Sequence, residues 1–141
     1  LSLLLSYPNY NQNIMQTKIL IVDDERDVEL LFRLQFRREI KEKHIYLQFA
    51  FSGEDALNYL HNINPMDVLL ILSDINMPGM NGLQLVEKVK AEFPAMRIIM
   101  VSAYGDDKNY NEAKAKGVDD FVTKPVNFVE LKRKMSRVIA I

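Results

Sequence analysis

The chain has 141 residues, of which 48% are hydrophobic and 26% are charged, and its formal net charge is −1. This size and composition fit one globular domain. The near-neutral charge argues against a domain that coats nucleic acid, because such domains are usually basic. The absence of cysteine excludes disulfides, thiolate metal sites and cysteine nucleophiles, and it is compatible with a cytoplasmic protein.

The first 16 residues precede the first strand-like run and differ from the rest of the chain. Their apolar start, Leu1–Leu5, is far shorter than the roughly 20 residues that a membrane-spanning helix needs. It also lacks the basic leading region of a secretory signal, so we expect no membrane association. Met15 is a candidate for the natural start. We expect residues 1–16 to form a disordered or vector-derived tail and residues 17–141 to form the domain.

Apolar, β-branched runs alternate with segments of helical periodicity along the rest of the chain. In chain order, strands are predicted at Lys18–Val22, Ile45–Phe51, Val68–Leu72, Arg97–Val101 and Phe121–Thr123. Helices are predicted after each of them, at Glu25–Glu39, Gly53–His61, Gly82–Glu92, Asp107–Lys116 and Phe128–Ile139. Most of the strand runs are continuously apolar, which is typical of strands covered on both faces.

Local signals support several helix ends. Ser52 is the predicted N-cap of the second helix, with Asp55 three residues later. Asn127 and Glu130 form a similar pair at the start of the last helix. Gly117 is expected to end the fourth helix.

The order of elements is a strand followed by a helix, repeated five times. This order predicts an α/β domain with a parallel five-stranded sheet and five helices divided between its two faces. Because crossovers between parallel strands are right-handed, few topologies remain. The expected one is the flavodoxin-like doubly wound sheet with strand order 2-1-3-4-5.

Polar residues stand where the predicted strands end. The first strand is followed by Asp23 and Asp24, the third by Ser73 and Asp74, the fourth by Ser102 and the fifth by Lys124. The carboxyl ends of parallel strands lie along one edge of the sheet, which is where open α/β sheets bind ligands. We therefore expect three carboxylates, a hydroxyl and an ammonium group to converge there.

Three neighbouring carboxylates need more positive charge than one lysine supplies. Two unit charges about 4 Å apart repel by roughly 4 kcal/mol at an effective dielectric of ~20. Either the carboxyl pKa values rise or a cation neutralises the group. Mg²⁺ suits a site with a few carboxylates, a carbonyl group and waters. With Mg²⁺ and Lys124 present, Asp74 could attack phosphorus to form an aspartyl phosphate, and Ser102 could bind a phosphoryl oxygen.

Four short motifs together resemble the receiver domains of response regulators in two-component signalling (CheY-like domains). They are ILIVDDE (Ile19–Glu25), DINMPGMNG (Asp74–Gly82), SAYGD (Ser102–Asp106) and TKP (Thr123–Pro125). The resemblance covers about Lys18–Ile139. It implies that Asp74 is the phosphoacceptor and that Mg²⁺, for which Mn²⁺ may substitute, is bound by Asp23, Asp24, Asp74 and the backbone carbonyl of Asn76.

The resemblance also implies roles for residues around this centre. Ser102 and Lys124 would contact the phosphoryl group, and Ser102 would act with the switch aromatic Phe121. The Lys124–Pro125 peptide bond is expected to be cis. Asn76 and Tyr104 occupy the positions at which the family tunes the lifetime of the phosphoryl group.

The implied function is that of a signalling domain that catalyses only its own phosphotransfer and slow autodephosphorylation. Its phosphodonor would be a histidine kinase or a histidine phosphotransfer protein. The fourth helix, fifth strand and fifth helix would then signal to an output domain or partner, and they could also form a homodimer. No direct nucleic-acid binding is expected.

Two other classes remain open from the residues themselves. A Mg²⁺-dependent phosphatase could also form an aspartyl phosphate, but such enzymes carry a second Asp two residues after the nucleophile, where this chain has Asn76. A flavin- or nucleotide-binding module would need a phosphate-binding loop rich in Gly, Ser or Thr after the first strand. This chain has Asp23-Asp24-Glu25-Arg26 there.

Overall fold

The computed structural model describes residues 17–42, 44–103 and 105–139. The predicted tail at residues 1–16 and the predicted lifetime-tuning residue Tyr104 lie outside this described part. Within it, none of the helices has both the length and the apolar character needed to cross a membrane.

A five-stranded parallel sheet forms the centre of the molecule. Its strand order is β2-β1-β3-β4-β5, which confirms the predicted flavodoxin-like topology. The strands are β1 Thr17–Val22, β2 Ile45–Ala50, β3 Val68–Asp74, β4 Ile98–Ser102 and β5 Asp120–Thr123. The third and fourth strands thus extend to Asp74 and Ser102, so both polar residues are held within the sheet.

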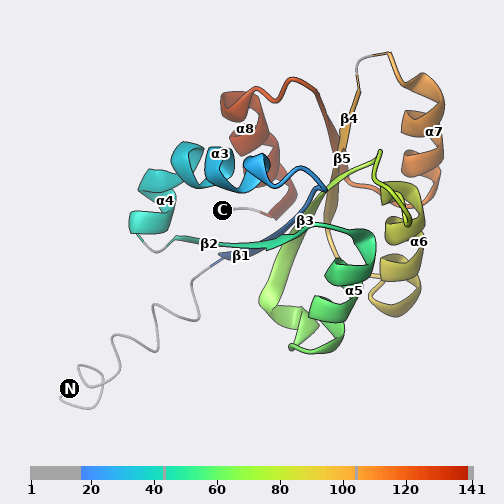
Figure 1. Ribbon diagram of the computed structural model, residues 1–141, viewed down its shortest axis with the longest axis horizontal. Helices are drawn as coiled ribbons and strands as arrows, with labels where there is room; N and C mark the ends of the chain where they lie inside the picture. Colours follow the sequence, from blue (N-terminus) through green and yellow to red (C-terminus); the bar gives the residue numbers. More distant parts are fainter. Residues whose placement is uncertain (1–16, 43, 104, 140–141) are drawn as a thin grey trace.

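Helices cover both faces of the sheet (Figure 1). One face carries α5 Gly53–His61, α6 Gly82–Glu92 and α7 Asp107–Ala115, and the other carries α3 Asp27–Gln35, α4 Arg37–Lys41 and α8 Phe128–Ile139. A short 3₁₀ helix, η1 Pro65–Asp67, precedes β3. This arrangement gives three layers, with the sheet between two helical layers.

Each face of the sheet has its own apolar core. Leu20, Val22 and Ile71 belong to the cluster that includes residues of α5 and α6. The alternate strand residues, such as Ile21 and Leu72, belong to the cluster that includes residues of α3 and α8. Because successive strand residues point to opposite faces, burial on both faces explains the continuous apolar runs in the sequence.

The first helical segment differs from the prediction of one helix over Glu25–Glu39. The structure has two helices, α3 and the short α4, separated at Phe36, where φ is −103° and ψ is 16°. The Gln35 carbonyl accepts a hydrogen bond from Lys132 Nζ of α8 at 2.8 Å. A side chain that bonds a helix carbonyl competes with the ladder of main-chain hydrogen bonds, which accounts for a break at this point.

The predicted helix caps of α5 and α8 are confirmed. Ser52 Oγ accepts a hydrogen bond from the Asp55 N–H at 3.0 Å, and Asn127 Oδ1 accepts one from the Glu130 N–H at 3.1 Å. The structure adds a reciprocal capping box at α6, in which Asn81 and Gln84 each accept from the main chain of the other at 2.9 Å. These caps hold the helices that follow the loops at the carboxyl edge of the sheet.

Candidate functional site

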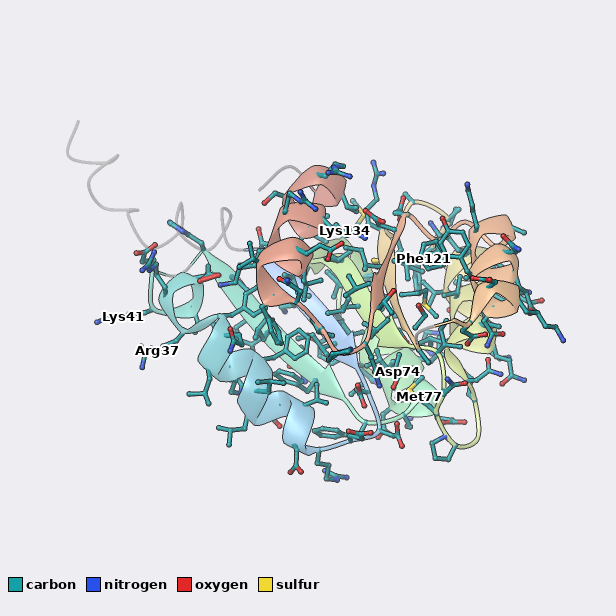
Figure 2. All side chains as sticks on the ribbon, turned by 90° about the horizontal axis from the view of Figure 1, so that it is seen from above. Arg37, Lys41, Asp74, Met77, Phe121 and Lys134 are labelled. Carbon is teal, nitrogen blue, oxygen red and sulfur yellow. The ribbon has the colours of Figure 1, made fainter. Side chains whose placement is uncertain are left out.

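Strand register brings the predicted site residues to one edge of the sheet. Val22 of β1 pairs with Ser73 of β3, so that Asp23 lies level with Asp74. Asp74 in turn pairs with Val101 of β4, which places Ser102 one residue beyond it. Asp74 lies at this edge near Met77, far from Arg37 and Lys41 of α4 (Figure 2).

Three carboxylates meet at this edge. Asp23, Asp24 and Asp74 each offer one carboxylate oxygen, and the three atoms lie within 4.8 Å of one another. Asp23 and Asp74 are buried, with 9% and 5% of their surface exposed. Asp24 is the most solvent-accessible of the three. The site therefore has two enclosed carboxylates and a third at its entrance.

Lys124 supplies the neighbouring positive charge. Its Nζ donates a hydrogen bond to Asp74 Oδ2 at 2.7 Å and lies 4.0 Å from Asp23 Oδ2. A contact of 2.7 Å between oppositely charged groups is a strong, charge-assisted hydrogen bond. One ammonium group next to three carboxylates leaves the cluster with excess negative charge.

The surroundings shift the ionisation of two members of the cluster. Burial raises the pKa of Asp23, and the negative charge of Asp74 raises it further, while the hydrogen bond from the Glu25 N–H and the charge of Lys124 oppose the rise. Burial lowers the pKa of Lys124, but the hydrogen bond and the charge of Asp74 outweigh that effect, so this pKa lies above its ordinary value. A compact acidic cluster therefore keeps Lys124 protonated and makes the ionisation of Asp23 less favourable.

The loop after β3 contacts the cluster directly. The Asn76 N–H donates to Asp74 Oδ1 at 3.3 Å, so both oxygens of Asp74 have a partner. At the far end of the loop, a Cβ atom built on Gly82 would lie 2.2 Å from the Asp74 carbonyl oxygen. Glycine is required there because the helix start approaches the strand end too closely for any side chain.

The strand ends on the other side of Asp74 carry the remaining predicted residues. Ser102 is 6% exposed, and its carbonyl oxygen accepts a hydrogen bond from the Lys124 N–H at 2.9 Å. The Lys124–Pro125 peptide bond is cis. Phe121 lies in β5, and its ring packs on Tyr110 of α7 with centroids 4.1 Å apart. Phe121 therefore lies further from the carboxylate cluster than Lys124 does, and it contacts α7.

The donor set fits a hard divalent cation. The three gathered ligand atoms are carboxylate oxygens, and the part of the chain that the structure describes contributes neither His nor Cys to the group. Mg²⁺ and similar ions prefer such oxygen ligands and keep several waters. The excess negative charge around Lys124 and the raised pKa of Asp23 are both relieved by a cation at this position.

The family is settled by the match of residues 19–136 to the model of the response regulator receiver domain. The chain belongs to this family. The sheet order, the acidic cluster and the lysine contact described above are thus features of a receiver domain.

Curated relatives of this receiver domain include regulators of known type. It is 34% identical over 116 residues to the response regulator GtcR of Aneurinibacillus migulanus, covering 82% of this chain and 45% of that protein. It is 31% identical over 125 residues to a 14.6 kDa protein of Leptolyngbya boryana, covering 86% and 89% of the two chains. The chain spans about half or less of the length of several of the curated relatives that it matches, GtcR among them.

Solved structures of other receiver domains share the fold. A receiver protein from Pseudomonas putida is 28% identical, with a TM-score of 0.76, covering 86% of this chain and 97% of that one. A CheY-like receiver domain from Methanospirillum hungatei is also 28% identical, with a TM-score of 0.78, covering 89% and 94%.

Three contacts around the receiver site were not predicted from the sequence. Glu54 of α5 accepts a hydrogen bond from the Met80 N–H at 3.0 Å, Tyr110 packs on Phe121, and Lys134 of α8 donates to the Phe121 carbonyl oxygen at 2.5 Å. All three side chains occur within helical segments and look like ordinary helix-surface residues. Nothing in their local sequence indicates a partner on another element.

Proposed function

We propose that this receiver domain accepts a phosphoryl group on Asp74 from a histidine kinase or a histidine phosphotransfer protein, in a reaction that requires Mg²⁺. The observation that carries the proposal is the buried Asp74 carboxylate, which has Lys124 Nζ at 2.7 Å and belongs to a cluster of three carboxylates. A carboxylate held beside cations is a nucleophile suited to phosphoryl transfer.

The transfer exchanges one bond to phosphorus for another. A carboxylate oxygen of Asp74 forms the new P–O bond as the P–N bond of phosphohistidine breaks. The imidazole leaves with the electron pair of that bond, takes up one proton from solvent and ends as neutral histidine. Lys124 stays protonated, which its raised pKa favours, and stabilises the negative oxygens in transfer.

Asp23, Asp24 and Asp74 would hold the metal ion together with the backbone carbonyl of Asn76. When bound, Mg²⁺ supplies positive charge that neutralises the carboxylates and the transferring phosphoryl group. Mn²⁺ would serve in the same role because it accepts the same oxygen ligands. The Ser102 hydroxyl, at the end of the adjacent strand, would bind a phosphoryl oxygen.

The donor would approach over α3. A groove of about 790 Å³ runs from Asp74 and Lys124 past Val28 and Leu31 to Phe128. Beside it, Leu30, Leu31 and Leu34 of α3 are 65%, 44% and 57% exposed. Exposed leucines next to a reactive carboxylate support docking of a protein that carries the phosphohistidine. Such a partner places the reaction in the cytoplasm.

The output surface would consist of α7, β5 and α8. After phosphorylation, Ser102 would move toward the phosphoryl group and Phe121 would turn inward, leaving its contact with Tyr110. This contact and the Lys134 bond to the Phe121 carbonyl oxygen join β5 to both helices of the surface. A change at Phe121 would therefore alter all three elements. The altered surface would contact an output domain, a partner or a second copy of the chain. Asn76 and Tyr104 would tune the lifetime of the phosphoryl group.

A small phosphodonor tests the proposal. Incubation with acetyl phosphate and Mg²⁺ should add the mass of one phosphoryl group, located on Asp74 by peptide mass spectrometry. Asp74→Asn should abolish this labelling, because an amide oxygen is a poor nucleophile. Asp67→Asn, in η1 before the amino end of β3, is the matched control and should leave labelling unchanged.

Three results would reject this function. They are labelling of Asp74→Asn at the native rate, labelling of the native protein at full rate in excess EDTA, and continuous hydrolysis of phosphate esters. The last result would instead favour a phosphatase.

A further inference from the structure

The loop between β3 and α6 is fixed at both ends. The Ile75 N–H donates to the Val101 carbonyl oxygen at 3.2 Å, and the Gly82 N–H donates to the Ile75 carbonyl oxygen at 2.7 Å. The Ile75 side chain is 2% exposed, and the Met77 side chain is 8% exposed. These contacts hold the base of the loop against the core.

The outer part of the loop is not buried in the core. Asn76, Pro78 and Gly79 are exposed. Yet Asn76 donates its N–H to Asp74 Oδ1 at 3.3 Å, so the path of this segment bears directly on the carboxylate cluster. A shift of the loop main chain by a fraction of an ångström changes that contact, and with it the placement of the Asn76 carbonyl group.

The first turn of α5 holds this outer part from outside. Glu54 Oε1 accepts a hydrogen bond from the Met80 N–H at 3.0 Å. Met80 also packs closely on Gly53, where an added Cβ atom would lie 2.9 Å from Met80 Sδ. Gly79, between Pro78 and Met80, has a φ of +70°, a conformation that glycine adopts without strain. The loop thus turns at Gly79 and is fastened to α5 at Met80.

Glu54 is suited to act as an ionised acceptor. Hydrogen bonds from its own N–H and from the Met80 N–H lower the pKa of its carboxyl group, so it carries a negative charge at neutral pH. A hydrogen bond to an ionised carboxylate is about twice as strong as one between neutral groups. Glu54 is not a member of the carboxylate cluster formed by Asp23, Asp24 and Asp74.

We propose that Glu54 is a positioning residue for the metal site: by binding the Met80 N–H, it fixes the loop from Ile75 to Asn81 so that the Asn76 main chain stays beside Asp74, and it thereby raises the affinity for Mg²⁺. This inference rests on the proposed Mg²⁺-dependent phosphorylation of Asp74. Glu54 acts through the loop and contacts neither the ion nor the phosphoryl group.

The experiment compares Glu54→Ala with Asp55→Ala. Asp55 is the next residue of the same helical turn, is also exposed and carries the same charge, and its structural contact is made by its N–H to Ser52 Oγ. Both variants lose one negative charge from the N-terminal turn of α5. Only Glu54→Ala loses the contact with the loop.

The first measurement is Mg²⁺ binding, followed by calorimetry or by amide chemical shifts, without any phosphodonor. We expect Glu54→Ala to bind Mg²⁺ about tenfold more weakly, the lower end of what the loss of a supporting contact costs a metal site. Asp55→Ala should bind Mg²⁺ like the native protein. Hydrogen exchange at the Met80 amide should accelerate in Glu54→Ala alone.

The second measurement is the rate of labelling by acetyl phosphate at increasing Mg²⁺. Glu54→Ala should need about tenfold more Mg²⁺ for half of the maximal rate, in line with its weaker binding, and should reach the native rate at saturation. Glu54→Gln keeps an acceptor oxygen for the Met80 N–H and should restore most of the native affinity.

Each alternative outcome overturns the inference. Native Mg²⁺ affinity in Glu54→Ala would show that the contact does not support the site. Equal losses in Glu54→Ala and Asp55→Ala would assign the effect to charge near the helix end. Glu54→Gln as weak as Glu54→Ala would exclude the hydrogen bond as the cause. If instead the native protein were labelled without any need for Mg²⁺, the proposed function itself would fail.

Discussion

At the scale of single residues, the site is a balance of charges that the protein alone leaves incomplete. Asp74 has Lys124 and the Asn76 N–H as partners, whereas Asp23 has the Glu25 N–H at 2.9 Å and only a distant Lys124 at 4.0 Å. Burial and the charge of Asp74 raise the pKa of Asp23. The metal-free native state is therefore strained electrostatically at Asp23.

Removing the charge of Asp23 should stabilise the metal-free protein. Asn retains the oxygen that accepts the Glu25 N–H, so Asp23→Asn removes little except the charge. In EDTA at pH ~7, above the ordinary carboxyl pKa, we expect a melting temperature a few degrees higher, the shift that about 1 kcal/mol produces in a domain of this size. Thermal unfolding followed by circular dichroism measures it, with Asp67→Asn as the control.

The increase in melting temperature caused by Asp23→Asn should depend on pH. Because the pKa of Asp23 is raised in the native state, its ionisation lowers the free energy of unfolding. This loss of stability is complete above the native pKa. It disappears as pH falls through the native pKa toward the unfolded one. The two melting temperatures should therefore converge at about pH 4, near the ordinary carboxyl pKa. A difference that grows on acidification would contradict this account.

At the scale of elements, an aromatic cluster joins α3, α4 and α8. Phe36, at the junction of α3 and α4, stacks on Phe32 with ring centroids 5.9 Å apart and meets Phe128 edge-on at 6.2 Å. Lys132 lies over the Phe36 ring at 4.9 Å and pairs with Glu39 at 2.7 Å. The break between the two helices thus places a buried ring where three helices meet.

Phe36 should be one of the most important residues for stability. It is 1% exposed, and Phe36→Ala leaves a cavity in the cluster, so the unfolding free energy should fall by about 3–5 kcal/mol. Leu34→Ala is the control, because Leu34 is 57% exposed in the adjacent helix and should change the value by about 0.5 kcal/mol or less. Urea unfolding measures both. A loss below about 1 kcal/mol for Phe36→Ala would show that the cluster is not a packing centre.

At the scale of the whole molecule, the site exists only when the sheet is assembled. Asp23 and Asp24 follow β1, Asp74 ends β3, and Lys124 follows β5. Separating any of these strands disperses the carboxylates. An ion bound by the cluster therefore binds the folded chain and not the unfolded one.

Mg²⁺ should stabilise the entire domain by this linkage. At a free concentration of about 100 times its dissociation constant, the unfolding free energy should rise by about 2.7 kcal/mol, and EDTA should reverse the change. Asp24→Asn removes one carboxylate of the proposed metal site, so its response to Mg²⁺ should be much smaller. Urea midpoints with and without Mg²⁺ give the test. An equal response in Asp24→Asn would place the ion elsewhere.

Much of the fold and of the site could be predicted because the relevant signals are local. Burial on both faces of β1 and β3 produced continuous apolar runs. Ser52 and Asn127 were recognisable as the caps of α5 and α8. Parallel strands align their carboxyl ends, so the positions of Asp23, Asp74, Ser102 and Lys124 followed from where the runs stop. The residue types and their order along the chain were sufficient for that inference.

Long-range contacts decided the rest. Lys132 meets the Gln35 carbonyl across 97 residues and divides the first helix, and Glu54 meets the Met80 N–H across 26 residues. The 2.7 Å contact between Lys124 and Asp74 spans 50 residues. It depends on β4, which pairs with both β3 and β5 and so sets their relative register. The sequence by itself determined which elements form and which residues reach the sheet edge. Only the tertiary structure determined which side chains touch, because such contacts depend on packing between elements that no local pattern encodes.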